Sequence, residues 1–107
     1  MTPPKSKKLQ MLEKLTEEGS EDPFHWYALA LEYRNLERTD EALQTFTTLR
    51  TRKSDYVPMY LMCGQMLEKV SRKEDAREWY EAGIAAARKK GDSHAVGELE
   101  GALAALT

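Results

Sequence analysis

The residues of this chain that could do chemistry are few and widely separated. Its two histidines, His25 and His94, lie 69 positions apart on different predicted helices, without a set of Cys or carboxylate residues at ligand spacing. A transition-metal site needs several such ligands brought together, so no metal site is expected. The single cysteine, Cys63, excludes an internal disulfide and lies where a packed thiol is favoured over a nucleophile. The sequence predicts no catalytic residue, no cofactor and no enzyme activity.

The charged clusters favour structural roles. The carboxylate pairs Asp40/Glu41 and Glu74/Asp75 recur at the start of two predicted helices, where negative charge stabilises the positive end of the helix dipole. The basic run at 88–90 suits a helix C-terminus for the same reason. No glycine-rich loop follows a strand, because no segment alternates convincingly between apolar and polar residues, so a phosphate cradle has no support.

A spacing of 34 residues organises the chain that must position these side chains. It pairs large residues with large ones and small residues with small ones, which suits a helical hairpin repeated along the sequence. The pairs are Trp26 with Tyr60, Ala30 with Gly64, Ala42 with Ala76, and Phe46 with Tyr80.

The apolar residues follow a helical period throughout. The first helix, from about Lys7, is expected to end at Gly19. Asp22 and Pro23 have the types that cap and open a helix.

Later in the chain a second such start lies between Asp55 and Pro58. The segment from Ser71 to Glu74 has the form of a capping box. A helix is expected to stop near Lys90-Gly91, and a last one to begin near Asp92.

Length and composition place the chain among soluble, single-domain proteins. It has 107 residues and a formal net charge of −2, without the basic excess of a nucleic-acid-binding protein. No stretch approaches the roughly 20 apolar residues of a membrane span. We therefore expect no nucleic-acid partner, no membrane association and a cytoplasmic location.

The pattern resembles the tetratricopeptide repeat, a 34-residue helical hairpin with the signature Trp, Leu, Gly, Tyr, Ala, Phe and often a closing Pro. In residues 23–56 the signature positions hold Trp26, Leu29, Ala30, Tyr33, Ala42 and Phe46. In residues 57–90 they hold Tyr60, Cys63, Gly64, Leu67, Ala76 and Tyr80. Where the family often closes with Pro, this chain has Ser54 and Arg88.

The resemblance implies an all-α fold, a right-handed superhelix of about six helices. Residues 1–5 are expected to form a flexible leader, and residues 6–107 a single domain. Within it we predict an N-terminal half-repeat helix at 6–20, repeats at 23–56 and 57–90, and a capping helix at 91–106. The end helices would cover the faces that two bare repeats leave exposed.

The resemblance also implies a function: the first helices of such hairpins line a concave face that binds a protein or peptide. The family's carboxylate clamp uses Lys and Asn there, but its first two positions here hold Tyr27 and Leu31. We expect instead a largely apolar segment, such as an amphipathic helix. The alternative is a structural subunit or homodimer in which a second copy of the chain occupies this face. The predicted partner-binding residues are Phe24, Tyr27, Leu31, Arg34, Asn35, Leu61, Met62, Gln65, Glu68 and Lys69.

Overall fold

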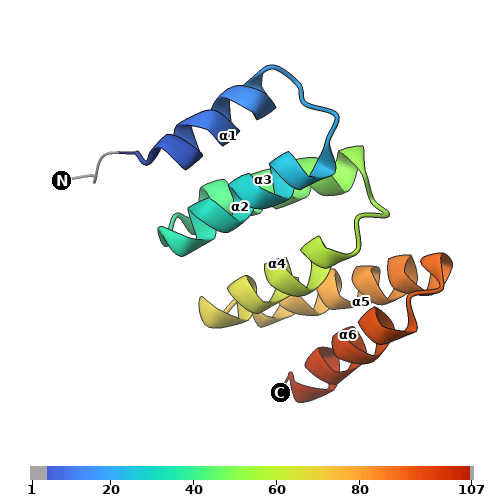
Figure 1. The fold of residues 1–107 in the computed structure, drawn as a ribbon. Helices are drawn as coiled ribbons and strands as arrows, with labels where there is room; N and C mark the ends of the chain where they lie inside the picture. The colour runs from blue at the N-terminus through green and yellow to red at the C-terminus, as the bar shows by residue number, and fades with distance from the viewer. Residues whose placement is uncertain (1–4, 107) are drawn as a thin grey trace. The chain divides into compact units, whose positions relative to one another are not determined.

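The fold is entirely helical over the part of the chain that the structure describes. The computed structural model describes residues 5–106, and these form six α-helices and no strand (Figure 1). The prediction of an all-α chain with six helices is confirmed. Of the expected leader at 1–5, residues 1–4 lie outside the described residues. The helices are α1 (Lys7–Glu17), α2 (Pro23–Asn35), α3 (Thr39–Arg52), α4 (Pro58–Lys69), α5 (Lys73–Lys90) and α6 (Ser93–Ala105).

The helices divide into two compact units, and each is described by itself. The N-terminal unit, Met1–Leu49, holds α1, α2 and most of α3. The C-terminal unit, Arg50–Thr107, holds the last residues of α3 together with α4, α5 and α6.

Three of the predicted helix ends are built by the residues that the sequence singles out. The Asp22 carboxylate accepts a hydrogen bond from the backbone N–H of Phe24 at 2.9 Å, and Pro23 opens α2. Asp92 caps α6 in the same manner, since its carboxylate accepts from the Ala95 N–H at 3.0 Å. Gly19 follows the end of α1 with a φ of 79°, a left-handed conformation that glycine adopts without strain.

The turns inside the two hairpins share one backbone geometry that the sequence does not predict. Glu37 and Ser71, 34 positions apart, both have a positive φ, of 59° and 64°. After α2, the Arg38 N–H bonds the Tyr33 carbonyl at 2.9 Å and the Glu37 N–H bonds the Arg34 carbonyl at 2.9 Å. This pair of bonds is the Schellman motif, which satisfies carbonyl groups left open at a helix end.

The turn after α4 repeats these bonds and shows that the predicted capping box is wrong. The Arg72 N–H bonds the Leu67 carbonyl at 2.8 Å, and the Ser71 N–H bonds the Glu68 carbonyl at 2.9 Å. Ser71 therefore belongs to the end of α4, and its left-handed backbone keeps it from the N-cap position. Arg72 is the N-cap of α5 and makes no side-chain cap hydrogen bond.

In the N-terminal unit, small and aromatic residues form the predicted core. Ala30 of α2 and Ala42 and Phe46 of α3 are fully buried. Leu9 and Leu12 of α1, which packs on α2, are also buried. The burial of these residues confirms the predicted apolar positions at Ala30, Ala42 and Phe46 and at two places on α1, whereas Met11, which the helical spacing also places on the apolar face of α1, is 56% exposed.

In the C-terminal unit, α4 and α5 approach so closely that glycine is required at two places. A Cβ atom added to Gly64 would lie 2.2 Å from the Cε1 atom of Tyr80. A Cβ atom added to Gly83 would lie 2.5 Å from the Cβ atom of Tyr60. Each helix therefore places a glycine beneath an aromatic residue of the other, and both rings are buried.

An arginine at the end of α3 packs on two aromatic rings of this unit. The Arg50 guanidinium carbon lies 4.8 Å from the centre of the Trp79 ring and 5.7 Å from that of Tyr60. Its two terminal nitrogens donate to the two Glu78 carboxylate oxygens, each at 2.7 Å. The guanidinium thus combines aromatic stacking with a two-point carboxylate pair, a geometry that lysine cannot reproduce.

We predict that alanine at Gly83 and at Gly97 changes stability in opposite directions. Gly83→Ala should lower the free energy of unfolding by about 1–3 kcal/mol, because its methyl group collides with the base of the Tyr60 side chain. Gly97→Ala should raise it by roughly 0.5–1 kcal/mol, because nothing lies near its Cβ position and alanine favours a helix. Chemical denaturation of both variants measures this, and equal stabilisation of the two would contradict the close packing.

Candidate functional site

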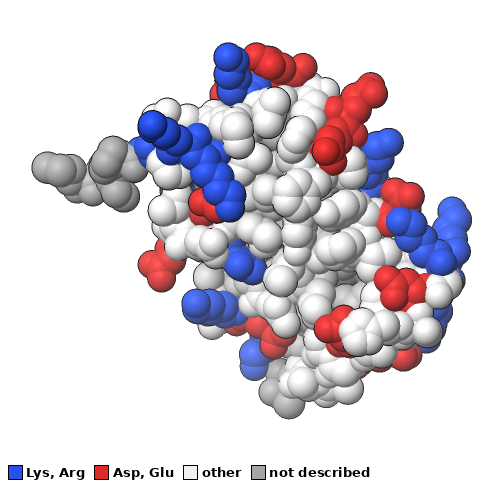
Figure 2. Space-filling view, in the orientation of Figure 1, with Lys and Arg blue, Asp and Glu red and all other residues white. Residues whose placement is uncertain are grey.

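The predicted site residues of α2 form one stripe along the helix. Phe24, Tyr27, Leu31 and Arg34 follow each other at steps of three or four residues, and Asn35 lies four residues after Leu31, so they share a face. Phe24 is 56% exposed. Tyr27, Leu31 and Arg34 are half-buried, and Asn35 is exposed. Figure 2 shows mostly uncharged surface, drawn white, over the first turns of α2.

The predicted site residues of α4 also share a face, but they expose less apolar surface. Leu61 and Met62 are half-buried, while Gln65 and Lys69 are exposed. Glu68 already has a partner within the chain, because its carboxylate accepts a hydrogen bond from the Tyr80 hydroxyl. The α4 stripe is therefore smaller and more polar than the α2 stripe, and one of its charges is engaged with α5.

A polar anchor that sequence analysis missed joins α1 to α2. The Tyr33 hydroxyl donates to a Glu13 carboxylate oxygen at 2.5 Å, and the Lys5 ammonium lies 2.8 Å from the other. The hydrogen bonds from Lys5 and Tyr33 lower the pKa of Glu13. Burial and the bond to Glu13 raise the pKa of Tyr33. No spacing rule could reveal this contact, because it joins residues 20 positions apart on different helices.

The first aromatic position of each repeat has a second role besides packing. The indole N–H of Trp26 donates to the Ser20 carbonyl oxygen at 2.8 Å, and the Tyr60 hydroxyl donates to the Ser54 carbonyl oxygen at 2.5 Å. Both acceptors lie six residues before their donor and 34 residues apart. The side chain at this position therefore fastens the loop that precedes the first helix.

The residues considered for catalysis or metal binding are not assembled into a site. Cys63 is fully buried, and burial raises the pKa of its thiol. His25 lies 2.6 Å from the Ser20 hydroxyl, and His94 is paired with Glu98 at 3.2 Å. Over residues 5–106 no three His, Cys, Asp or Glu side chains come together as a metal site.

Comparison with solved structures decides the family. A tetratricopeptide repeat domain protein from Salinibacter ruber, solved by solution NMR and by crystallography, is 36% identical to this chain. Each match covers 77% of this chain, with 83% and 92% of the other chain and TM-scores of 0.73 and 0.70. The chain belongs to the tetratricopeptide repeat family. A Bordetella parapertussis protein solved by solution NMR, 25% identical over 96% of this chain and 89% of that one, has the same fold with a TM-score of 0.77.

No protein-family model matches the sequence, and no curated protein matches it. Membership in the tetratricopeptide repeat family rests on the solved structures, and it indicates a scaffold for protein interaction in general. No helix within the described range is long and apolar enough to cross a membrane.

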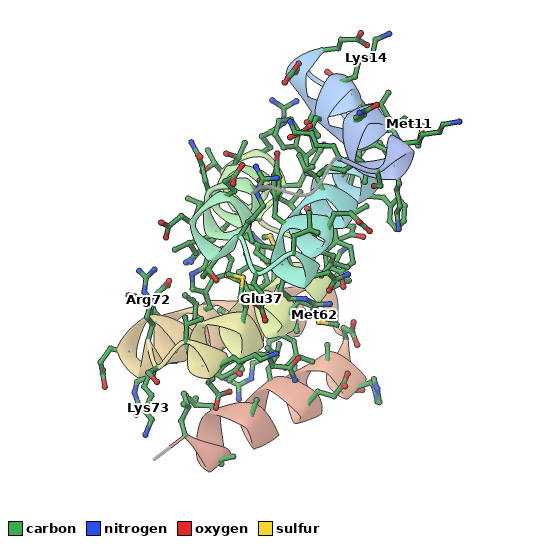
Figure 3. All side chains as sticks on the ribbon, turned by 90° about the vertical axis from the view of Figure 1, so that its left-hand side faces the viewer. Met11, Lys14, Glu37, Met62, Arg72 and Lys73 are labelled. Carbon is green, nitrogen blue, oxygen red and sulfur yellow. The ribbon has the colours of Figure 1, made fainter. Side chains whose placement is uncertain are left out.

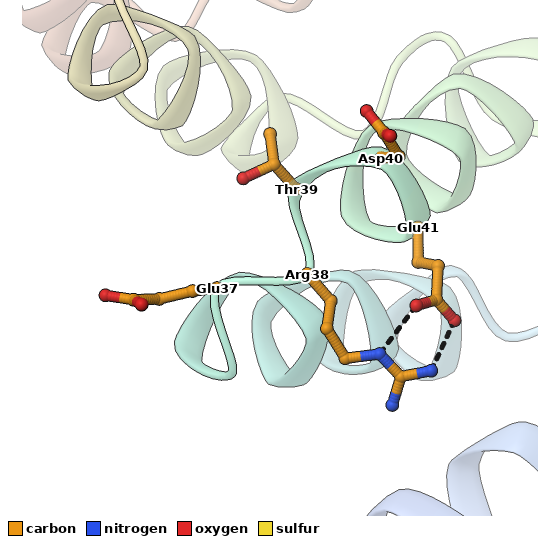
Figure 4. A pocket seen from close by; sticks show the side chains of 5 residues that line it. All are labelled: Glu37, Arg38, Thr39, Asp40 and Glu41. Carbon is orange, nitrogen blue, oxygen red and sulfur yellow. Dashed lines mark hydrogen bonds and ion pairs between the residues drawn. The ribbon is translucent and has the colours of Figure 1, made fainter. Parts of the chain in front are cut away.

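This tetratricopeptide repeat protein also has an open depression at the turn between α2 and α3. Five consecutive residues, 37–41, line it (Figure 4). Arg38 donates through two nitrogens to the Glu41 carboxylate, both at 2.6 Å, and its guanidinium lies 5.0 Å from the centre of the Tyr33 ring. The depression is formed by consecutive residues of the turn. Its one basic side chain, Arg38, is already paired, so the depression offers no free cation to a ligand.

The tyrosines of this repeat protein predict a loss of stability in alkali. The native state holds the Tyr33 proton above its usual pKa of 10.0, whereas the unfolded chain releases it there. Between the unfolded and the native pKa the native state binds more protons, so its stability falls as pH rises above 10.0 towards the native pKa. We expect the stability gap between the wild type and Tyr33→Phe to narrow between about pH 9 and about pH 11. Urea unfolding at both pH values tests this, and a constant gap would contradict it.

Proposed function

We propose that this chain is a protein-interaction scaffold that holds a partner through the α2 stripe, formed by Phe24, Tyr27, Leu31, Arg34 and Asn35. The observation that carries the proposal is the 56% exposure of Phe24. Large aromatic side chains gain most by burial, and an exposed apolar patch of neighbouring residues, here Phe24 with Tyr27 and Leu31, marks an interaction site.

The chemistry of the stripe favours a helical partner segment with an apolar face. Phe24, Tyr27 and Leu31 extend over about 10 Å of helix axis, since each residue adds about 1.5 Å. A partner helix with apolar residues three or four positions apart matches this length. Arg34, whose side chain bonds Asn35 at 3.1 Å, supplies a positive charge at the end of the stripe. An acidic residue at the corresponding end of the partner segment would complement it.

The exposed face of α4 is proposed as a separate and weaker contact surface. Leu61 and Met62 offer apolar atoms, and Gln65 and Lys69 offer hydrogen-bond donors. The flexible thioether of Met62 suits contact with more than one side-chain shape.

The proposal predicts crosslinking that depends on position. A photoactivatable amino acid at position 24 should yield a covalent adduct in the cell of origin, because a bound segment would cover that side chain. The same amino acid at position 36 is the matched control, since Leu36 is apolar and 44% exposed but lies outside the stripe. Mass spectrometry of the adduct identifies what is bound.

The outcomes separate the two candidate occupants. An adduct with a different protein at position 24 but not at 36 supports the scaffold. An adduct of two identical chains supports the alternative, in which a second copy occupies the stripe. Equal yields at positions 24 and 36, or none at either, would refute a binding role for this stripe.

Phe24→Glu should weaken a genuine interaction by roughly tenfold or more.

A further inference from the structure

Helix α1 exposes a position of the repeat that the other second helices, α3 and α5, bury. Counted at 34-residue intervals, Met11 of α1 corresponds to Thr45 of α3 and Trp79 of α5. Thr45 is 8% exposed and Trp79 is 6% exposed, but Met11 is 56% exposed. Figure 3 shows Met11 and Lys14 on α1, the helix at the start of the chain.

The C-terminal unit shows what normally covers this position. Trp79 faces the first helix of its own hairpin, because its ring centre lies 5.8 Å from that of Tyr60 on α4, and the Arg50 guanidinium also lies over its ring at 4.8 Å. Met11 therefore lies on the face that a second helix turns towards its own first helix. In the described residues that precede α1 there is no such helix.

Helix α6 shows the complementary feature. In the 34-residue register α6 corresponds to the first helices, so Gly97, Glu98 and Gly101 take the places of Cys63, Gly64 and Leu67. The three residues of α4 are buried, whereas the three residues of α6 are exposed. A Cβ atom added at Gly97 or Gly101 would meet nothing within 4 Å. The face that α4 turns towards its second helix is thus uncovered on α6.

The charges of the two exposed faces are also complementary. On α1, Lys7 and Lys14 are exposed, lie one turn to either side of Met11, and make no ion pair with a described residue. On α6, Glu98 lies on the exposed face and Glu100 beside it, and the helix contains no Lys or Arg. The Glu98 carboxylate lies 3.2 Å from the Nε2 atom of His94, and the Glu100 carboxylate lies 2.9 Å from the Arg88 guanidinium.

The geometry points to an interface between two copies of this chain, in which α1 of one copy packs against the exposed face of α6 of the next. The two helices form an intermolecular hairpin that resembles the hairpin of α4 and α5, with Met11 over the open positions at Gly97 and Gly101. The lysines of α1 then approach Glu98. Because the two surfaces differ, the contact runs head to tail, and each added copy presents the same unused faces again.

Blocking each face separately tests this arrangement. Met11→Glu places a negative charge where α1 would meet Glu98. Gly101→Glu places a charged side chain on the exposed face of α6. The matched controls are Gln10→Glu, an exposed neighbour at a position that α3 and α5 also expose, and Gly101→Ala, which adds only a methyl group. Thermal unfolding of each variant checks that it is folded.

Sedimentation velocity across a wide concentration series is the measurement. The wild type and both controls should associate as concentration rises, and each blocked variant should associate at least roughly tenfold more weakly. Mixing the two blocked variants should restore a one-to-one pair, because each retains the face that the other has lost. A wild type that stays monomeric, blocked variants that associate like the wild type, or a mixture that does not pair would each overturn the proposal.

Discussion

The reciprocal contact of glycine with tyrosine between α4 and α5 is the constraint on which the hairpin of the C-terminal unit depends. Tyr80 lies against Gly64 and Tyr60 lies against Gly83, so the missing side chain on each helix admits the ring of the other. The short distance between the helices follows, and with it the burial of Cys63 and the position of Trp79. Because a protein core contains few voids, a larger residue at either glycine must displace the tyrosine ring that lies against it, and the core has no space for that displacement.

Hydrogen-bond donors explain why the first signature position holds Trp26 and Tyr60. A phenylalanine would fill the same space but could not donate to the carbonyl of Ser20 or Ser54. These carbonyls precede the first helix of each repeat, so the donors determine where the chain enters the hairpin. The spacing of 34 residues thus describes hydrogen bonds as well as packing.

Sequence reasoning succeeded where the information is periodic or local. Helical spacing located all the helices, and Asp22 and Gly19 marked ends that the structure confirms. It failed at Ser71, because the motif that resembles a capping box describes side chains, whereas the backbone there is governed by the Schellman bonds of α4. The anchor between Glu13 and Tyr33 was also invisible, since its partners meet only through tertiary packing. For the site, the sequence predicted which residues share a face of α2 but not how much of Phe24 is exposed.

The left-handed residues Glu37 and Ser71 are two positions at which substitution can raise the stability of this protein. Neither is glycine, although that conformation costs a non-glycine residue about 1–2 kcal/mol. The turn bonds run between backbone groups, so they place no demand on the side chain at either position. Evolution or design can therefore alter these two sites without touching the core or the α2 stripe. A destabilising change elsewhere in the repeat could be compensated at its turn.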